Sequence, residues 1–450
     1  RISSVDPNGT LTTEVYDGAG RRISRAWQTA AGVGGPVLET FDYDGLNRLI
    51  AAQSGGAATS FSYDSLSRKT AESTNGRRLD YVRDLVGNPT MVTYPSGLRI
   101  GRVFDSLDRA RSIGLVPAGN AAPLKDSLVP LASYSFQGTN LVAGANYSNG
   151  LSMSRTFDAA NRQLSNVIQS TLGPVLSESL SWSPRNLKTA TSRGEANGRS
   201  QVFAYDEAGR LTQAARTAAP RPANNTVVDP LALAGLPEQF QFQYDKADTL
   251  IQRTSQTAGE PKREAMPADA SGRNRPSEIA GKPLAWDANG NLLSKGDLRF
   301  EYDAKNRLIR VARATGVEIA RFTYDAMNRR IERTTGGQTY STAWSNWQPI
   351  EERMNGELIS RRTYGLRLDE VVRLETIDPS TGLTAEYVPV YDDTGHVAAV
   401  TGEQGKPIER YITSPYGEVE IHVDVVPPAV EQVRTSDGKL WIELSEEILA

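Results

Sequence analysis

A short motif that recurs along nearly the whole chain constrains its fold more than any other feature. Each copy has an aromatic residue, then Asp, two variable positions and a residue that tolerates positive φ, often followed by Arg. Chance would supply only about one such match in a chain of this composition, so the copies are repeats of one structural unit. The best-formed copies comprise Tyr16, Asp17 and Gly20; Tyr43, Asp44 and Asn47; Tyr63 and Asp64; Tyr205, Asp206 and Gly209; Trp286, Asp287 and Gly290; Tyr302, Asp303 and Asn306; Tyr324, Asp325 and Asn328; and Tyr391, Asp392 and Gly395. Weaker copies begin at Phe104, Phe157 and Tyr244, and Arg83-Asp84 is a degenerate one.

The residue types of the motif are those of a β-hairpin turn. Asp opens a type I turn by accepting backbone N–H bonds, and Gly or Asn three residues later takes the left-handed conformation cheaply. Only Ser67 departs from Gly, Asn or Asp at that position. We therefore predict hairpins centred near Asp44, Asp206, Asp303 and Asp325, with positive φ at Asn47, Gly209, Asn306 and Asn328.

The spacing of the regular copies, roughly 20 residues, fits two short strands and two turns per repeat. A unit of this size cannot bury an apolar face alone, so successive hairpins must continue one another into one long, curling antiparallel sheet. The low hydrophobic content of 38% and the mean hydropathy of -0.44 agree with thin sheets that have one solvent-exposed face. The predicted class is all-β, an array of hairpins.

The motif residues also resemble a known family. Trp286-Asp287-Ala288-Asn289-Gly290-Asn291-Leu292, the copies at Tyr302 and Tyr324, and Tyr391-Asp392-Asp393-Thr394-Gly395-His396-Val397 are similar to the repeats of bacterial RHS/YD-repeat (tyrosine-aspartate repeat) proteins. Counting weaker repeats, the resemblance covers some 90% of the chain. It implies an RHS-type β-cocoon, in which the sheet winds into a hollow shell.

Two regions follow from where the repeats stop. We expect residues 1–423 to form the repeat shell. Residues 424–450 read as a linker followed by a segment, turning at Asp437-Gly438, that resembles the start of a bacterial Ig-like domain, and the resemblance implies the truncated start of an Ig-like β-sandwich. The chain does not begin with Met, and we expect it to be a fragment of a longer protein. Three Pro-, Ala- and polar-rich interruptions, Gly114 to Gly150, Arg216 to Glu238 and Ser255 to Pro283, are predicted to be surface loops.

The chain lacks the residues that most enzymes need. It has no Cys and only two His, His396 and His422, so thiolate, zinc and His-based nucleophilic sites are not expected. A pair of carboxylates could still make a glycosidase, but the motif Asp residues stand where the turns need them. We predict no catalytic residue, no metal site and no cofactor, and with a net charge of -3 and no long apolar run, no nucleic-acid partner and no membrane insertion.

Arg follows the left-handed position in most copies and could form a ladder along the sheet. The ladder would either bind acidic glycans or an acidic cargo, or pair with neighbouring Asp and Glu while packing over the aromatic rings, and the near-neutral charge favours the second. On the premise that these Arg side chains are exposed, we expect a β-branched residue at Gly209 or Gly290 to harm folding more than the loss of any motif Arg. The series comprises Arg21, Arg48, Arg68, Arg109, Arg162, Arg210, Arg307 and Arg329.

The sequence thus favours a non-catalytic shell or scaffold segment of a large secreted or cell-surface protein. Its expected partner is an enclosed polypeptide cargo or a cell-surface glycan. Two alternatives stay open: a carbohydrate-binding adhesion module, and an encapsulating carrier of a polymorphic toxin. The residues that follow Ala450 in the full gene would separate a scaffold from a toxin carrier.

Overall fold

The regular secondary structure of the described residues is almost wholly β-strand, which confirms the predicted all-β class. The computed structural model describes residues 2–117, 119, 128–195, 198–217, 237–257, 261–268, 273, 275–423, 430–436 and 439–444. These residues contain one 3-10 turn, η2 (Glu403–Gly405), and no α-helix. No helix among them has the length and apolar character that a membrane crossing would require.

The first large sheet has 22 strands within the described residues. Each strand pairs antiparallel with its neighbour along the chain, so the sheet grows hairpin by hairpin. The strands are β1 (Ile2–Val5), β2 (Leu11–Tyr16), β3 (Arg22–Gln28), β5 (Leu38–Tyr43), β6 (Leu49–Ser54), β7 (Ala57–Tyr63), β8 (Lys69–Thr74), β9 (Arg77–Arg83), β10 (Pro89–Thr93), β11 (Arg99–Phe104), β12 (Ala110–Leu115), β13 (Val129–Gln137), β14 (Leu141–Tyr147), β15 (Ser152–Phe157), β16 (Gln163–Ser170), β17 (Gly173–Trp182), β18 (Lys188–Arg193), β19 (Ser200–Tyr205), β20 (Leu211–Thr217), β21 (Glu238–Tyr244), β22 (Leu250–Thr257) and β23 (Lys262–Ala265).

The second large sheet has 16 strands in the described part of the chain and grows in the same way. Its one parallel partner is the short strand β4 (Val33–Gly34), which comes from the first hairpins and pairs with β27. The other strands are β24 (Glu278–Ile279), β25 (Lys282–Trp286), β26 (Leu292–Lys295), β27 (Leu298–Asp303), β28 (Leu308–Arg313), β29 (Glu318–Tyr324), β30 (Arg330–Thr335), β31 (Gln338–Ser345), β32 (Gln348–Met354), β33 (Glu357–Tyr364), β34 (Val371–Ile377), β35 (Thr384–Tyr391), β36 (Val397–Thr401), β37 (Pro407–Thr413) and β38 (Val419–Val423).

The motif turns have the predicted hairpin geometry. In the copy at Tyr43, the N–H of Asn47 donates to the carbonyl of Asp44 at 3.1 Å, and the strand register shifts between Asp42 and Tyr43. Even Ser67 is left-handed, with φ of 61°. A bulge of this kind bends its strand and increases the local twist, so repeating it makes the sheet curl. The φ angles are 64° at Asn47, 84° at Gly209, 58° at Asn306, 67° at Asn328, 77° at Gly20, 93° at Gly290 and 87° at Gly395.

Two of the three interruptions are not plain surface loops, so that prediction was wrong for them. The segment from Gly114 to Gly150 contains β13 and β14, and the segment from Ser255 to Pro283 contains β23 and β24. Their backbones pair with the flanking repeats although their turns lack the motif. The segment from Arg216 to Glu238 lies largely outside the described residues.

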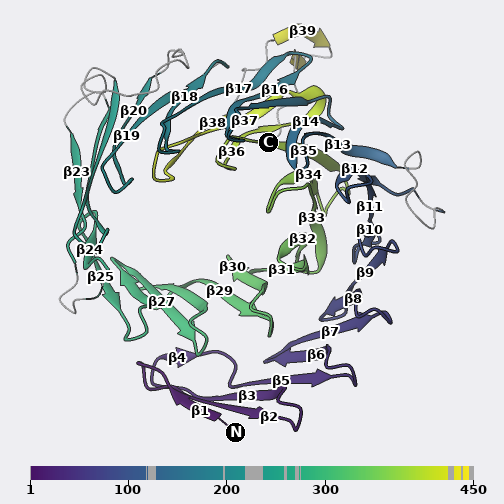
Figure 1. Cartoon of the computed structure of the whole chain (residues 1–450), viewed down its shortest axis with the longest axis vertical. Coiled ribbons are helices and arrows are strands. Elements are labelled where there is room, and N and C mark those ends of the chain that lie inside the picture. Colours follow the sequence, from purple (N-terminus) through teal and green to yellow (C-terminus); the bar gives the residue numbers. More distant parts are fainter. Residues whose placement is uncertain are drawn as a thin grey trace.

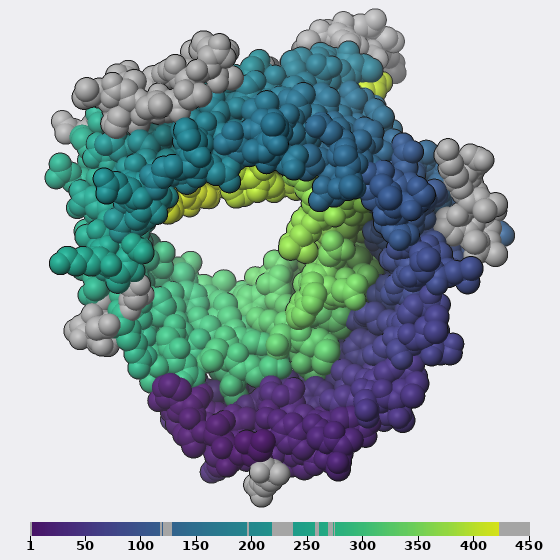
Figure 2. Space-filling view, viewed as in Figure 1, coloured from purple at the N-terminus to yellow at the C-terminus, as the bar shows by residue number. Residues whose placement is uncertain are grey.

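The curled sheets wind into a two-lap spiral around an open centre (Figures 1 and 2). The first lap is the first sheet, and the second lap comprises β24 to β38. The sequence separation between hydrogen-bonded partners in the two laps falls from 279 residues at Asn8–Asp287 to 172 residues at Tyr244–Tyr416. The second lap therefore follows the same arc with fewer residues, and β30 to β33 lie closer to the centre than the first lap in Figure 1.

The main hydrophobic core joins the two laps. It contains Leu79, Ile113 and Leu176 from the first lap, which are almost fully buried, together with Ile350 and Val372 from the second. Each lap thus covers apolar surface that a single thin sheet could not bury. Beyond the spiral, β39 (Val430–Ser436) and β40 (Lys439–Leu444) form a separate two-stranded hairpin, while the preceding Pro-rich linker and the predicted turn at Asp437-Gly438 lie outside the described residues.

Candidate functional site

The motif Asp organises its turn with both carboxylate oxygens. Oδ1 of Asp44 accepts the N–H groups of Leu46 and Arg48 at 2.9 and 3.0 Å, and Oδ2 accepts Nε of Arg48 at 2.6 Å. These bonds favour the ionised carboxylate, and the largest contribution comes from the Arg48 N–H, so the pKa of Asp44 lies below its usual value. At Asp105 the side chain of Arg109 lowers the pKa to about 2.

The motif Arg ties each hairpin to the next one. Besides pairing with its own Asp, Arg48 donates from Nη1 to the carbonyl of Asp64 in the following turn at 2.7 Å and lies over the Tyr63 ring at 5.0 Å. Arg307 repeats both contacts with Asp325 and Tyr324, at 3.0 and 4.8 Å. Equivalent pairs of contacts are made by Arg21, Arg109, Arg162 and Arg210.

The motif aromatic makes the return connection. The hydroxyl of Tyr63 donates to the carbonyl of Leu49, which directly follows Arg48, at 2.8 Å. Tyr324 donates to Leu308 in the same way at 2.8 Å. The ring is therefore held between an Arg and a backbone carbonyl of the preceding hairpin. The same bond to the corresponding carbonyl is made by Tyr43, Tyr205 and Tyr244, and by the indole N–H of Trp182.

Three other motif aromatics use different partners. Tyr16 donates to Glu14 at 2.7 Å, the indole of Trp286 donates to the carbonyl of Pro276 at 2.8 Å, and the hydroxyl of Tyr391 accepts the N–H of Val371 at 2.7 Å. His396 replaces Arg in the last of these copies, and its ring contacts Thr394 at 2.9 Å.

The Arg ladder is engaged within the sheet, as the near-neutral charge favours. The premise that these side chains are exposed was wrong, because they range from 31% exposed at Arg210 to 4% at Arg329. Each bridges two turns. Those that also lie over a ring are Arg21, Arg48, Arg109, Arg162, Arg210 and Arg307. The ladder side chains connect adjacent repeats to each other. The sequence pattern alone does not distinguish this role from that of a binding stripe.

Each lap of the spiral has two edges, and the laps are joined where one kind of edge on one lap meets the other kind on the next lap. We call the edge that carries the motif turns the motif edge, and the opposite one the strand-end edge. The motif edge of the second lap meets the strand-end edge of the first: Asn8 donates to Asp287 at 2.8 Å, and Lys305 donates to Glu39 at 2.8 Å. This junction, which we call the seam, continues through polar contacts around the ring.

Buried charges of the first lap are matched by cations of the second. Glu72 is 2% exposed, and Arg329 bonds to it while also bonding to its own motif Asp325. Thr74 accepts a further bond from Arg329 at 3.2 Å. A motif Arg in the second lap thus serves both the repeat and the seam.

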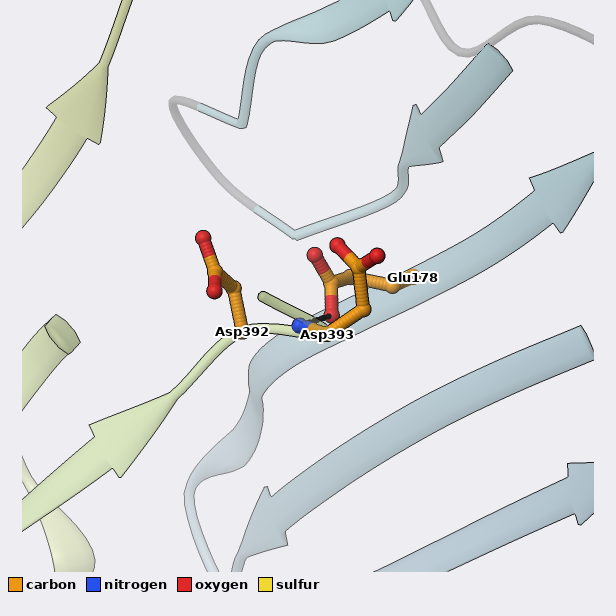
Figure 3. Close-up of side chains that lie close together, drawn as sticks. All are labelled: Glu178, Asp392 and Asp393. Atoms are coloured by element: carbon orange, nitrogen blue, oxygen red, sulfur yellow. Dashed lines mark hydrogen bonds between the residues drawn. The ribbon is translucent and has the colours of Figure 1, made fainter. Parts of the chain in front are cut away.

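One part of the seam contains three carboxylates, from Glu178, Asp392 and Asp393 (Figure 3). Oε2 of Glu178, in β17, accepts the backbone N–H of Asp393 at 3.0 Å. Lys188 pairs with Asp393 at 2.8 Å, and Arg193 pairs with Glu178 at 3.2 Å. Burial raises the pKa of Glu178 to about 7, although Arg193 opposes the shift, and the two aspartates add to it.

The cluster fits a structural junction better than a reaction centre. Carboxylate oxygens within 4.8 Å of one another are of the type that can hold a divalent cation. Here Lys188 and Arg193 already bring positive charge to them, and Asn166 donates to Glu178 at 3.1 Å. Sequence reasoning missed Glu178 because it lies outside the motif and 215 residues from Asp393.

These features define a class of protein: a hollow β-shell built from aromatic-Asp hairpin repeats. The Teneurin YD-shell family matches residues 223–424. The matched residues include the copies at Tyr244, Trp286, Tyr302, Tyr324 and Tyr391, so the match supports an RHS/YD-repeat protein over that part of the chain. No curated protein matches it.

Solved structures share the fold at low sequence identity. The Tc holotoxin pore of Photorhabdus luminescens has a TM-score of 0.74 and 12% identity, over 93% of this chain and 23% of that one. A complex titled TcdB2-TccC3-Cdc42 has a TM-score of 0.75 and 11% identity, with the same coverage of 93% and 23%. TcdB2-TccC3 without its hypervariable C-terminal region has a TM-score of 0.73 and 12% identity, again covering 93% and 23%. The chain therefore spans under a quarter of the length of these three chains.

Proposed function

We propose that this chain forms part of the wall of a hollow shell that encloses a polypeptide. The observation that carries the proposal is the open centre of a sheet that curls through two laps and is sealed along the seam (Figure 2). The matched structures add support, since one contains Cdc42 together with TcdB2-TccC3 and another is TcdB2-TccC3 without its hypervariable C-terminal region. A shell needs no catalytic residue to separate its contents from solvent.

The proposal can be tested by protease protection of the longest natural product that contains these residues. We expect a polypeptide segment inside the shell to survive digestion while the shell is intact, even though the chain is cut near residues 424–429. The enclosed segment should be digested once Arg329→Ala and Lys188→Glu open the seam, whereas Arg48→Ala, away from the seam, should leave it protected. Equal digestion of that polypeptide in the wild type and the seam variants would overturn the proposal.

A non-catalytic role is part of the same proposal. The motif carboxylates accept backbone N–H groups in their own turns, as at Asp44. Glu178 accepts one hydrogen bond from the side chain of Asn166 and one from the backbone N–H of Asp393. We expect no hydrolysis of glycan or peptide substrates. Turnover that disappears with a single Asp→Asn change outside the motif turns would contradict this.

We further propose a secreted or cell-surface protein with two regions, the shell at residues 1–423 and an Ig-like start at 424–450. In the described residues β39 and β40 pair only with each other, which supports a separate module. Limited proteolysis should cut near residues 424–429.

The glycan-binding alternative needs open aromatic platforms, whereas rings such as Tyr63 and Tyr324 are covered by Arg.

A further inference from the structure

A run of exposed apolar side chains follows the motif edge of the first lap. Leucine occupies the second position after Asp in three motif turns, and the degenerate turn between them adds a Leu-Val pair. Together they occupy four successive hairpins. They are Leu46 (62% exposed), Leu66 (67%), Leu85 (97%), Val86 (73%) and Leu107 (59%).

The turns do not require these residues. The same position holds alanine in other turns of the first lap: Ala19, Ala160, Ala208 and Ala247. Single exposed leucines are common on proteins, but a contiguous row across neighbouring elements is typical of an interaction surface. We call this row the leucine edge.

The corresponding turn positions in the second lap show how such an edge packs when another sheet covers it. The two residues after Asp325 are Ala326, which is 7% exposed, and Met327. Both pack with Phe41 and Ala52 of the first lap. The positions that are exposed in the leucine edge are thus an interface in the second lap.

In the part of the chain that the structure describes, two sheet edges are not joined by the seam. One is the motif edge of the first lap, which carries the leucine edge. The other is the strand-end edge of the second lap, where Val317 and Leu383 are 63% and 71% exposed. These are the same two kinds of edge that join in the seam, and each carries apolar side chains.

We propose that the leucine edge is a docking surface for the strand-end edge of the second lap in a second copy of this chain. The contact continues the geometry of the seam from one molecule to the next. It joins two different surfaces, so it is heterologous and leaves one free edge of each kind on the pair.

Sedimentation velocity of the 450-residue chain over rising concentration tests the proposal. We expect the wild type to associate, and Leu66→Glu to lower the association constant at least about tenfold, since it places a charge in an apolar contact. Leu172→Glu is the matched control, because Leu172 is 65% exposed on the strand-end edge of the first lap. Unchanged association in Leu172→Glu supports the assignment, and an equal loss overturns it.

A mixing experiment separates this contact from a symmetric one. Leu66→Glu blocks the leucine edge and Leu383→Glu blocks the opposite free edge, so each variant alone should be monomeric while an equimolar mixture forms a one-to-one dimer. Dimers of Leu383→Glu alone would show leucine edges pairing with each other and would overturn the proposal. A wild type that stays monomeric would also overturn it and assign the leucine edge to a different partner.

Discussion

The first and second laps use the same motif in different surroundings. In the first lap the Asp44 and Arg48 side chains are 21% and 20% exposed, whereas in the second Asp325 and Arg329 are 0% and 4% exposed. The local hydrogen bonds are almost identical in length, 2.6 and 2.7 Å. Stability contributions therefore depend on whether a motif turn faces solvent or the seam, and the motif alone does not determine them.

Removing the motif Arg should separate the two laps most clearly. Arg329→Ala leaves the buried Asp325 without its cation and Glu72 with Lys69 alone, and we expect a loss of about 3–5 kcal/mol. Arg48→Ala should cost clearly less, because Asp44 can be solvated. Urea denaturation with comparison of midpoints measures both, and equal losses would mean that the seam adds nothing to the motif.

The pH dependence of the seam should be the next largest effect. Burial raises the pKa of Glu178 from 4.5 to about 7, so the folded state holds its proton more tightly than the unfolded state. The stabilisation is fully present below the unfolded value and is lost as pH rises through about 7, by on the order of 1–3 kcal/mol. The difference between the wild type and Glu178→Gln, followed from pH 4 to 9, isolates this group. A flat difference would refute the assignment.

Glycine substitution should erase the difference between the laps. Gly209 and Gly290 have φ of 84° and 93°, and a Cβ at either would meet nothing closer than 4.0 Å. Gly209→Val and Gly290→Val should each cost about 1–2 kcal/mol from backbone strain alone. If the motif arginines were exposed, these glycine substitutions would destabilise the fold more than Arg→Ala. Because Arg329 is buried, the order is reversed in the second lap, where Arg329→Ala should cost more than Gly290→Val. Markedly unequal losses for the two glycines would show that the seam also constrains the turns.

The smallest effect should come from the aromatic hydroxyls. Tyr63→Phe and Tyr324→Phe each remove one 2.8 Å bond to the preceding hairpin and should cost about 1 kcal/mol. Hydrogen exchange should increase in the neighbouring hairpin in both laps. Exchange that rises only near Tyr324 would indicate that first-lap repeats are not coupled through their rings.

The repeat could be predicted because its determinants are local. Asp44 and Asn47 fix a turn within a few residues, and the resulting bulge curls the sheet. The strands β13 and β14 could not be predicted, since the turn at Gly138 lacks Asp, yet Arg109 still donates to its carbonyl at 2.9 Å. The seam was equally hidden, because Glu72 and Glu178 resemble ordinary strand residues and their partners lie 257 and 215 residues away.

The seam also constrains how such a chain can evolve. A repeat array usually gains or loses units freely, since each unit contacts only its neighbours. Here a hairpin duplicated in the first lap would move every later cross-lap pair, such as Lys188 with Asp393, by one unit. The number of hairpins per lap is therefore under selection together with the charged residues that face each other across the seam. Compensating duplications, one in each lap, should leave these pairs matched while widening the opening.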